Sequence, residues 1–155
     1  MTPVETLARC PLFRDFTDTG LRILASIAQE RSVPEGAPIF VEGMLGESLF
    51  VIRRGRVQLG LRSADGRDRG LAALGEGDSF GELSLICPDV PRLVSAVART
   101  PVDLLELRQR DFAKLQTQKP QACLKLVLAI AGTFGRRVAE GRETFRDLLA
   151  PVARQ

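Results

Sequence analysis

The sequence contains no histidine, and this absence excludes several functional classes at once. Histidine is the commonest general base, the usual haem ligand and a frequent zinc ligand. The three cysteines, Cys10, Cys87 and Cys123, lie far apart and form no C-x-x-C pair, which disfavours a zinc knuckle, an iron–sulfur cluster or a thioredoxin-type site. We therefore expect no catalytic residue, no metal and no cofactor, and we interpret the cysteines as buried thiols in a reducing compartment.

Tryptophan and tyrosine are also absent, and with them the aromatic rings that commonly stack on nucleic-acid bases. The net charge is +3 but unevenly distributed: residues 1–107 hold 12 basic and 15 acidic side chains, and residues 108–155 hold 10 and 4. Because we recognise no nucleic-acid-binding motif in the sequence, we interpret the basic tail as a solvated helical face rather than a nucleic-acid site.

Long apolar runs are missing as well. No run reaches the ~18 residues that a membrane span requires, so we expect no membrane insertion. The first five residues carry no basic segment before an apolar one, which argues against a secretory signal and leaves the cytoplasm as the expected location. A length of 155 residues suits a single core with a helical appendage.

Glycine is abundant in the middle of the chain, where ten of the 14 glycines lie between positions 36 and 81. Short apolar or alternating runs separate them and continue beyond them, at residues 39–41, 49–52, 57–61, 71–74, 93–98 and 102–107. Asp65-Gly66 is the strongest hairpin signal. About seven or eight short strands at this spacing predict a double-layered or closed antiparallel unit.

Both ends of the chain read as helical. Residues 18–30 place Leu21, Leu24, Ile27 and Ala28 at helical spacing, which predicts an N-terminal helix. Residues 110–118 form a second short helical segment. Pro120 suits the first turn of a longer helix that we expect to continue past Arg142.

An apolar heptad pattern runs along this last helix. Its spacings of 4, 3, 4, 3, 4, 3 and 4 residues join Val127, Ala131, Phe134, Val138, Gly141, Phe145, Leu148 and Val152. Such a stripe can pack on the chain's own β unit or form a two-helix seam between subunits. Because the seam extends beyond what a compact barrel covers, we expect a homodimer.

The segment from Gly75 to Ile86 carries the clearest chemical signal. Its glycines permit tight turns and close ligand approach, a short helix is expected to start near Glu82, and Arg92 follows ten residues later. Backbone N–H groups at about Leu83 and Ser84, together with a guanidinium, suit a phosphate, and a carboxylate suits a ribose hydroxyl. A capping residue and a structural Glu82–Arg92 ion pair are the alternatives.

The motifs, in this order, resemble those of the cyclic-nucleotide-binding domain family, which includes catabolite activator proteins and the regulatory subunits of cyclic-AMP-dependent kinase. The resemblance covers about Leu7 to Val138. It includes Pro11-Leu12-Phe13, the glycine-punctuated residues 36–57, and residues 77–85, which closely resemble the phosphate-binding cassette. It implies a mainly β fold with α flanks: an antiparallel, jelly-roll-like β-roll at 34–109 with its cassette at 80–93, a helical lead at 1–33 and a helical tail at 110–155.

The family pattern also implies residue roles. Glu82 would accept a hydrogen bond from the ribose 2′-OH. The backbone N–H groups of Gly81 to Ser84 would donate to the cyclic phosphate, and Arg92 would form an ion pair with this phosphate. Positions that resemble the apolar wall around purine and sugar, and that could equally be barrel core, are Leu59, Leu71, Ala72, Leu74 and Phe80. The long helix resembles the C-helix that closes over the base, where Arg136, Arg137 and Glu140 are possible base contacts and Val127, Ala131, Phe134, Val138, Gly141 and Phe145 the dimer seam.

Two departures qualify the resemblance. Leu93 stands where the family often has serine or threonine, so its N–H can reach the phosphate but no hydroxyl can, which costs about tenfold in affinity. No helix-turn-helix is recognised after the C-helix, so we expect no direct DNA binding within this chain. The prediction is a non-enzymatic cAMP or cGMP sensor that couples binding to C-helix rearrangement in a dimer. The alternative is a degenerate domain that serves as a ligand-independent dimerisation or docking module.

Overall fold

The computed structural model describes residues 1–62 and 68–141. Its strands form two antiparallel four-stranded sheets, ordered β1-β8-β3-β6 and β2-β7-β4-β5, which together make a β-roll. The strands are β1 (Ala28–Val33), β2 (Pro38–Phe40), β3 (Ser48–Arg54), β4 (Val57–Arg62), β5 (Asp68–Leu74), β6 (Ser79–Phe80), β7 (Ser95–Ala98) and β8 (Val102–Arg108). The expected fold class is confirmed.

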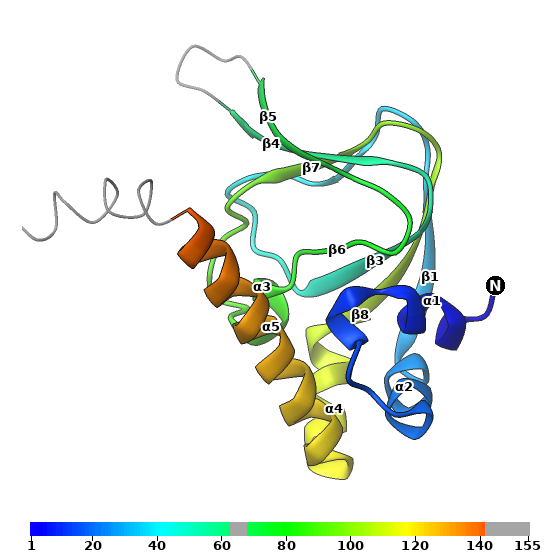
Figure 1. Ribbon diagram of the computed structural model, residues 1–155. Helices are drawn as coiled ribbons and strands as arrows, with labels where there is room; N and C mark the ends of the chain where they lie inside the picture. Colours follow the sequence, from blue (N-terminus) through cyan, green and yellow to red (C-terminus); the bar gives the residue numbers. More distant parts are fainter. Residues whose placement is uncertain (63–67, 142–155) are drawn as a thin grey trace, which may run out of the picture.

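Helices flank the roll and gather at one end of it, while the longest runs along one side (Figure 1). They are α1 (Pro3–Arg9), the 3-10 turn η1 (Pro11–Phe13), α2 (Asp18–Ala25), α3 (Leu83–Ile86), α4 (Gln109–Gln118) and α5 (Pro120–Glu140). No helix in the described ranges combines the length and hydropathy needed to cross a bilayer.

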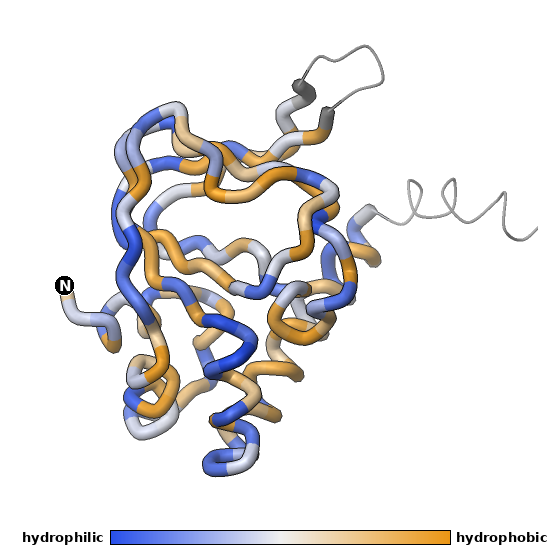
Figure 2. The backbone as a smooth tube through the Cα atoms, turned by 180° about the vertical axis from the view of Figure 1, so that it is seen from behind, coloured by the Kyte–Doolittle hydropathy of each residue, from blue (hydrophilic) through white to orange (hydrophobic). Residues whose placement is uncertain are grey.

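The central strands β3 and β8 carry buried side chains on both faces, which explains the apolar run at residues 49–52 and the adjacent buried Leu104 and Leu105. Leu49 and Val51 of β3 join a core cluster with the helices. Their neighbours Phe50 and Ile52 point the opposite way into a second cluster between the sheets, because successive strand residues alternate faces. Apolar segments accordingly recur on the strands and on α5 in Figure 2.

The N-terminal lead differs from its prediction. The helix expected over residues 18–30 ends at Ala25, and Ala28–Val33 form β1, which pairs with β8 along its whole length. The strand therefore begins before residue 34, and the helical lead is shorter than expected. Val33 is the one buried residue of this strand, so its sequence carries little strand periodicity and pairing with β8 decides the structure.

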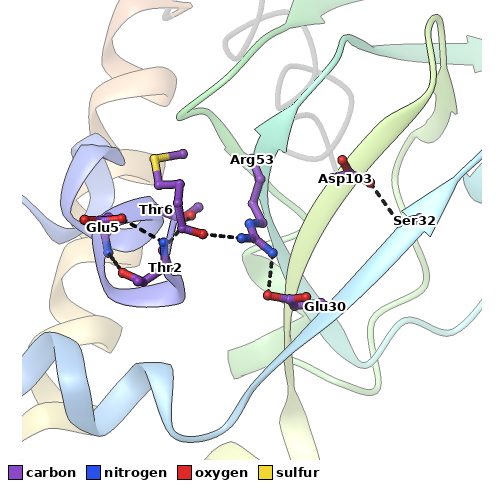
Figure 3. A network of polar contacts seen from close by, with 8 residues as sticks. Thr2, Glu5, Thr6, Glu30, Ser32, Arg53 and Asp103 are labelled. Carbon is purple, nitrogen blue, oxygen red and sulfur yellow. Dashed lines mark hydrogen bonds and ion pairs between the residues drawn. The ribbon is translucent and has the colours of Figure 1, made fainter.

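Polar contacts fix the start of the chain to the sheet. A capping box joins Thr2 and Glu5, which explains why α1 begins at Pro3. Arg53 of β3 donates to the carbonyl of Met1 and forms an ion pair of 2.6 Å with Glu30 of β1 (Figure 3).

Two other expectations concern residues at the edge of the described ranges. The Asp65-Gly66 turn lies outside them, although β4 and β5 pair antiparallel on either side of it. Helix α5 ends at Glu140 with Gly141 as its C-cap, and its expected continuation past Arg142 lies outside the described residues.

Candidate functional site

A cavity of about 500 Å³ lies between the β-roll, the segment from Phe80 to Val94 and α5. Its volume is within the range of small-molecule sites. The predicted site residues that line it are Leu59, Leu71, Ala72, Leu74, Phe80, Gly81, Glu82, Leu83, Ser84, Arg92, Leu93 and Arg137. The structure thus brings the expected cassette and the expected apolar wall around one space.

The cassette begins at Gly81, which follows β6 and has a φ of +77°. A Cβ atom there would lie 2.9 Å from the carbonyl oxygen of Ser48, so both backbone conformation and space require glycine. The N–H of Ser84 donates to the carbonyl of Gly81 at 3.2 Å. In the described part of the chain, the N–H groups of Glu82 and Leu83 have no backbone acceptor, so these two are the available donors.

Helix α3 starts as expected next to Glu82, but it has only four residues. A helix this short has a small dipole, so its contribution to an anion site comes from individual N–H groups rather than from a macrodipole. The sequence interpretation included Ser84 among the donors to the phosphate, and in this structure the Ser84 N–H donates to the carbonyl of Gly81.

Glu82 is buried, with 8% of its surface exposed, and lines the cavity. The hydroxyl of Ser79 donates to its Oε1 at 2.9 Å. Within residues 1–62 and 68–141, no ion pair joins Glu82 to Arg92, although the alternative of a structural ion pair predicted one. A buried carboxylate with spare acceptor capacity suits a ligand that carries hydroxyl donors.

Arg92 is 7% exposed and its guanidinium lies 4.0 Å from the ring centroid of Phe40 and 5.9 Å from that of Phe50. Its Nη2 donates to the carbonyl of Ser48 at 2.9 Å and its Nη1 to that of Gly81 at 3.3 Å. Within the described residues, Nε has no acceptor although it is buried. A buried cation that lacks one acceptor is a strong candidate for binding an anion.

Burial lowers the pKa of Arg92 to about 10, while the negative charges of Glu106 and Glu82 act in the opposite direction. The guanidinium therefore carries its charge at neutral pH, but in surroundings that have fewer polar partners than water offers. An anionic ligand would supply the missing charge.

Leu93, the chief departure from the family pattern, lies at the rim of the cavity with 61% of its surface exposed. Most of its side chain therefore faces solvent. Its N–H has no backbone acceptor in the part of the chain that the structure describes, and it remains a possible donor to a ligand.

Helix α5 closes one side of the cavity with Ile130, Thr133, Phe134 and Arg137. Of the expected base contacts, Arg137 lines this cavity, Arg136 lines a neighbouring hollow beside η1, and Glu140 lines neither. The sequence interpretation missed Ile130 and Thr133. Positions 130, 133, 134 and 137 follow the i, i+3, i+4, i+7 pattern of one helical face, and this signal could have identified them.

The expected dimer seam divides between different surroundings. Val127 is half-buried against the chain's own core, and Phe134 lines the cavity. Ala131 and Gly141 are exposed, Val138 is half-buried, and Phe145 lies outside the described residues. An outward apolar stripe on α5 instead runs through Leu124, Leu128, Ala131, Gly135 and Val138, which we call the α5 stripe.

A β-roll with a phosphate-type cassette and a helix over its mouth defines a small-ligand-binding regulatory domain. The family model described as the cyclic nucleotide-binding domain matches residues 30–119, and the chain belongs to this family.

Named relatives support the same family assignment. The chain is 36% identical over 121 residues to the Cyclic AMP receptor protein of Thermus thermophilus, a match that covers 78% of this chain and 56% of the relative. It is 30% identical over 145 residues to the CRP-like cAMP-activated global transcriptional regulator of Mycobacterium tuberculosis, covering 94% of this chain and 62% of the relative. This chain therefore spans roughly three fifths of these relatives or less.

The fold agrees too. The crystal structure of the Thermus thermophilus Catabolite Activator Protein has a TM-score of 0.78 and 34% identity, covering 90% of this chain and 63% of that one.

Proposed function

We propose that this domain binds a cyclic nucleotide, cAMP or cGMP, in the cavity between the β-roll and α5. The single observation that carries the proposal is Arg92, a buried cation that still lacks one acceptor and lies beside the free N–H groups of the cassette. In this arrangement the cyclic phosphate accepts from the N–H groups of Glu82 and Leu83 and from the guanidinium. The Glu82 carboxylate accepts from the ribose 2′-OH.

The base then lies between the apolar wall of the roll and α5. Leu59, Leu71 and Leu74 line one side of this space, and Phe134 and Arg137 line the other. Because α5 contributes part of the cavity wall, a bound ligand favours the position of this helix that it contacts best. The equilibrium between two helix positions shifts by the difference between the ligand's affinities for them.

We further propose that two copies associate through α5, with the α5 stripe as the contact. Leu128 in this stripe is 62% exposed, and an exposed leucine on a helix with 3-and-4 spacing is typical of a two-helix seam. Ligand contact on one face of α5 would then alter the dimer contact on the other face.

This chain matches part of a longer relative that is named as a transcriptional regulator. We therefore infer that the domain is the sensor of a regulator and carries no catalytic activity.

Isothermal titration calorimetry with cAMP and with cGMP tests the binding proposal. We expect saturable binding of at least one, and a loss of about ten- to hundredfold in affinity in Arg92→Ala, because the phosphate loses a charged hydrogen-bond partner. Arg99→Ala is the matched control, since Arg99 is exposed in the β7–β8 turn and lies outside the cavity lining. Absence of heat and of thermal stabilisation at millimolar nucleotide would overturn the proposal.

A further inference from the structure

Ser79 lines the cavity and contacts the proposed ribose-binding carboxylate. It lies on β6 opposite Val51 of β3, and its hydroxyl donates to Glu82 Oε1 at 2.9 Å. This is the one hydrogen bond that the Glu82 carboxylate accepts within the described residues. The terminal torsion of a glutamate is broad, so a single fixed donor has a large effect on where its second oxygen points.

The N-terminal segment lies close to the turn before β6. At Gly77 in this turn, an added Cβ would lie 3.5 Å from the carbonyl oxygen of Arg9. The next residue, Cys10, is 1% exposed. The turn η1, which follows directly, packs against α5.

The Cys10 thiol adds no negative charge near Glu82. Burial, the largest cause, raises the pKa of Cys10 to about 11, and the charges of Glu82 and Asp78 act in the same direction. The thiol therefore keeps its proton at neutral pH, and Ser79 is the described donor to the Glu82 carboxylate.

We propose that Ser79 is a positioning residue of this site: its hydroxyl orients the Glu82 carboxylate toward the ribose 2′-OH. This inference rests on the proposed function.

The experiment compares each cyclic nucleotide with its 2′-deoxy analogue by calorimetry. The ratio of the two affinities measures what the 2′-OH contributes, and a merely structural role would leave this ratio unchanged. We expect the ratio to fall about tenfold in Ser79→Ala, the scale of one hydrogen bond to a charged group. Ser32→Ala is the matched control, because the Ser32 hydroxyl also donates to a carboxylate, that of Asp103 at 2.7 Å, and lies outside the cavity lining.

A second variant retains the hydroxyl. Ser79→Thr is expected to keep the wild-type ratio, because threonine can still donate to Glu82. An unchanged affinity ratio in a folded Ser79→Ala overturns the proposal, and so does a ratio that falls equally in Ser79→Thr. If the wild type binds neither nucleotide, the proposed function fails, and the role in sugar recognition fails with it.

Discussion

Replacement of Gly46 by alanine should disable the arginine of the site without removing it. Gly46 lies between β2 and β3, far from Arg92 in the sequence. A Cβ atom added there would lie 2.0 Å from Nε and 2.4 Å from Cζ of Arg92, where ordinary contacts begin at 3.4 Å. Since Gly46 is not among the glycines with positive φ, the backbone accepts alanine and the conflict falls on the arginine alone.

The expected loss of stability follows from the contacts that the displaced guanidinium loses. It makes two hydrogen bonds to carbonyl oxygens, of 2.9 and 3.3 Å, and lies over the ring of Phe40. Hydrogen bonds to a charged group contribute about 1.5 to 3 kcal/mol each, and a desolvated cation–π contact about 2 kcal/mol. Because the displaced side chain regains water, we expect a net loss of roughly 2 to 3 kcal/mol in the free energy of unfolding.

Denaturant unfolding and nucleotide calorimetry measure the two consequences. We expect nucleotide affinity to fall about ten- to hundredfold, as in Arg92→Ala. Gly75→Ala is the matched control: a Cβ there meets nothing within 4 Å and its φ is not positive, so its stability should stay equal or rise by about 0.4 to 1 kcal/mol. The reasoning is refuted if the two alanine variants have the same stability and affinity.

Two more predictions concern α5 and Cys10. Phe134→Ala should weaken nucleotide binding about tenfold and leave the dimer intact, because Phe134 lines the cavity. Leu128→Glu should shift the mass measured by light scattering toward the monomer, because Leu128 lies on the α5 stripe. Loss of the dimer in both variants would contradict this assignment of the two faces. The raised pKa of Cys10, about 11 against an ordinary 9.0, stabilises the fold below pH 9, and this part is lost as the pH rises to 11. The stability advantage of wild type over Cys10→Ala should therefore shrink by on the order of 2 kcal/mol between pH 8 and 11 in denaturant titrations, and a constant difference would contradict it.

The strands that the sequence predicted best are those whose burial leaves a pattern. Residues 49–52 are all apolar, and residues 102–107 are apolar at four of six positions, because β3 and β8 serve two cores; both runs matched strands. β1 was missed because its pairing with β8 buries one side chain out of six, and β6 because two residues are too few to show periodicity.

The order of residues in the cassette was predictable, since the glycines, Glu82 and Arg92 follow one another along the chain. The arrangement of Arg92 was not. Its guanidinium lies over Phe40, contacts the carbonyl of Ser48 and needs the space at Gly46, and these residues lie about 44 to 52 positions earlier. Nothing local to Arg92 indicates that the β-roll brings them together.

Helix α5 shows why a heptad pattern alone does not determine which face of a helix meets a second copy. Cys123, Leu126 and Ile130 pack into the core, Ile130 and Phe134 line the cavity, and Leu124 and Leu128 face outward. A helix with apolar residues toward three different surroundings has no single apolar stripe, so the same sequence fits several 3-and-4 spacings. The expected seam and the α5 stripe share Ala131 and Val138, and therefore substitutions at these two positions cannot distinguish the alternatives. Leu128 belongs to the stripe alone and Phe134 to the expected seam alone, which is why this pair decides which face of α5 meets a second copy.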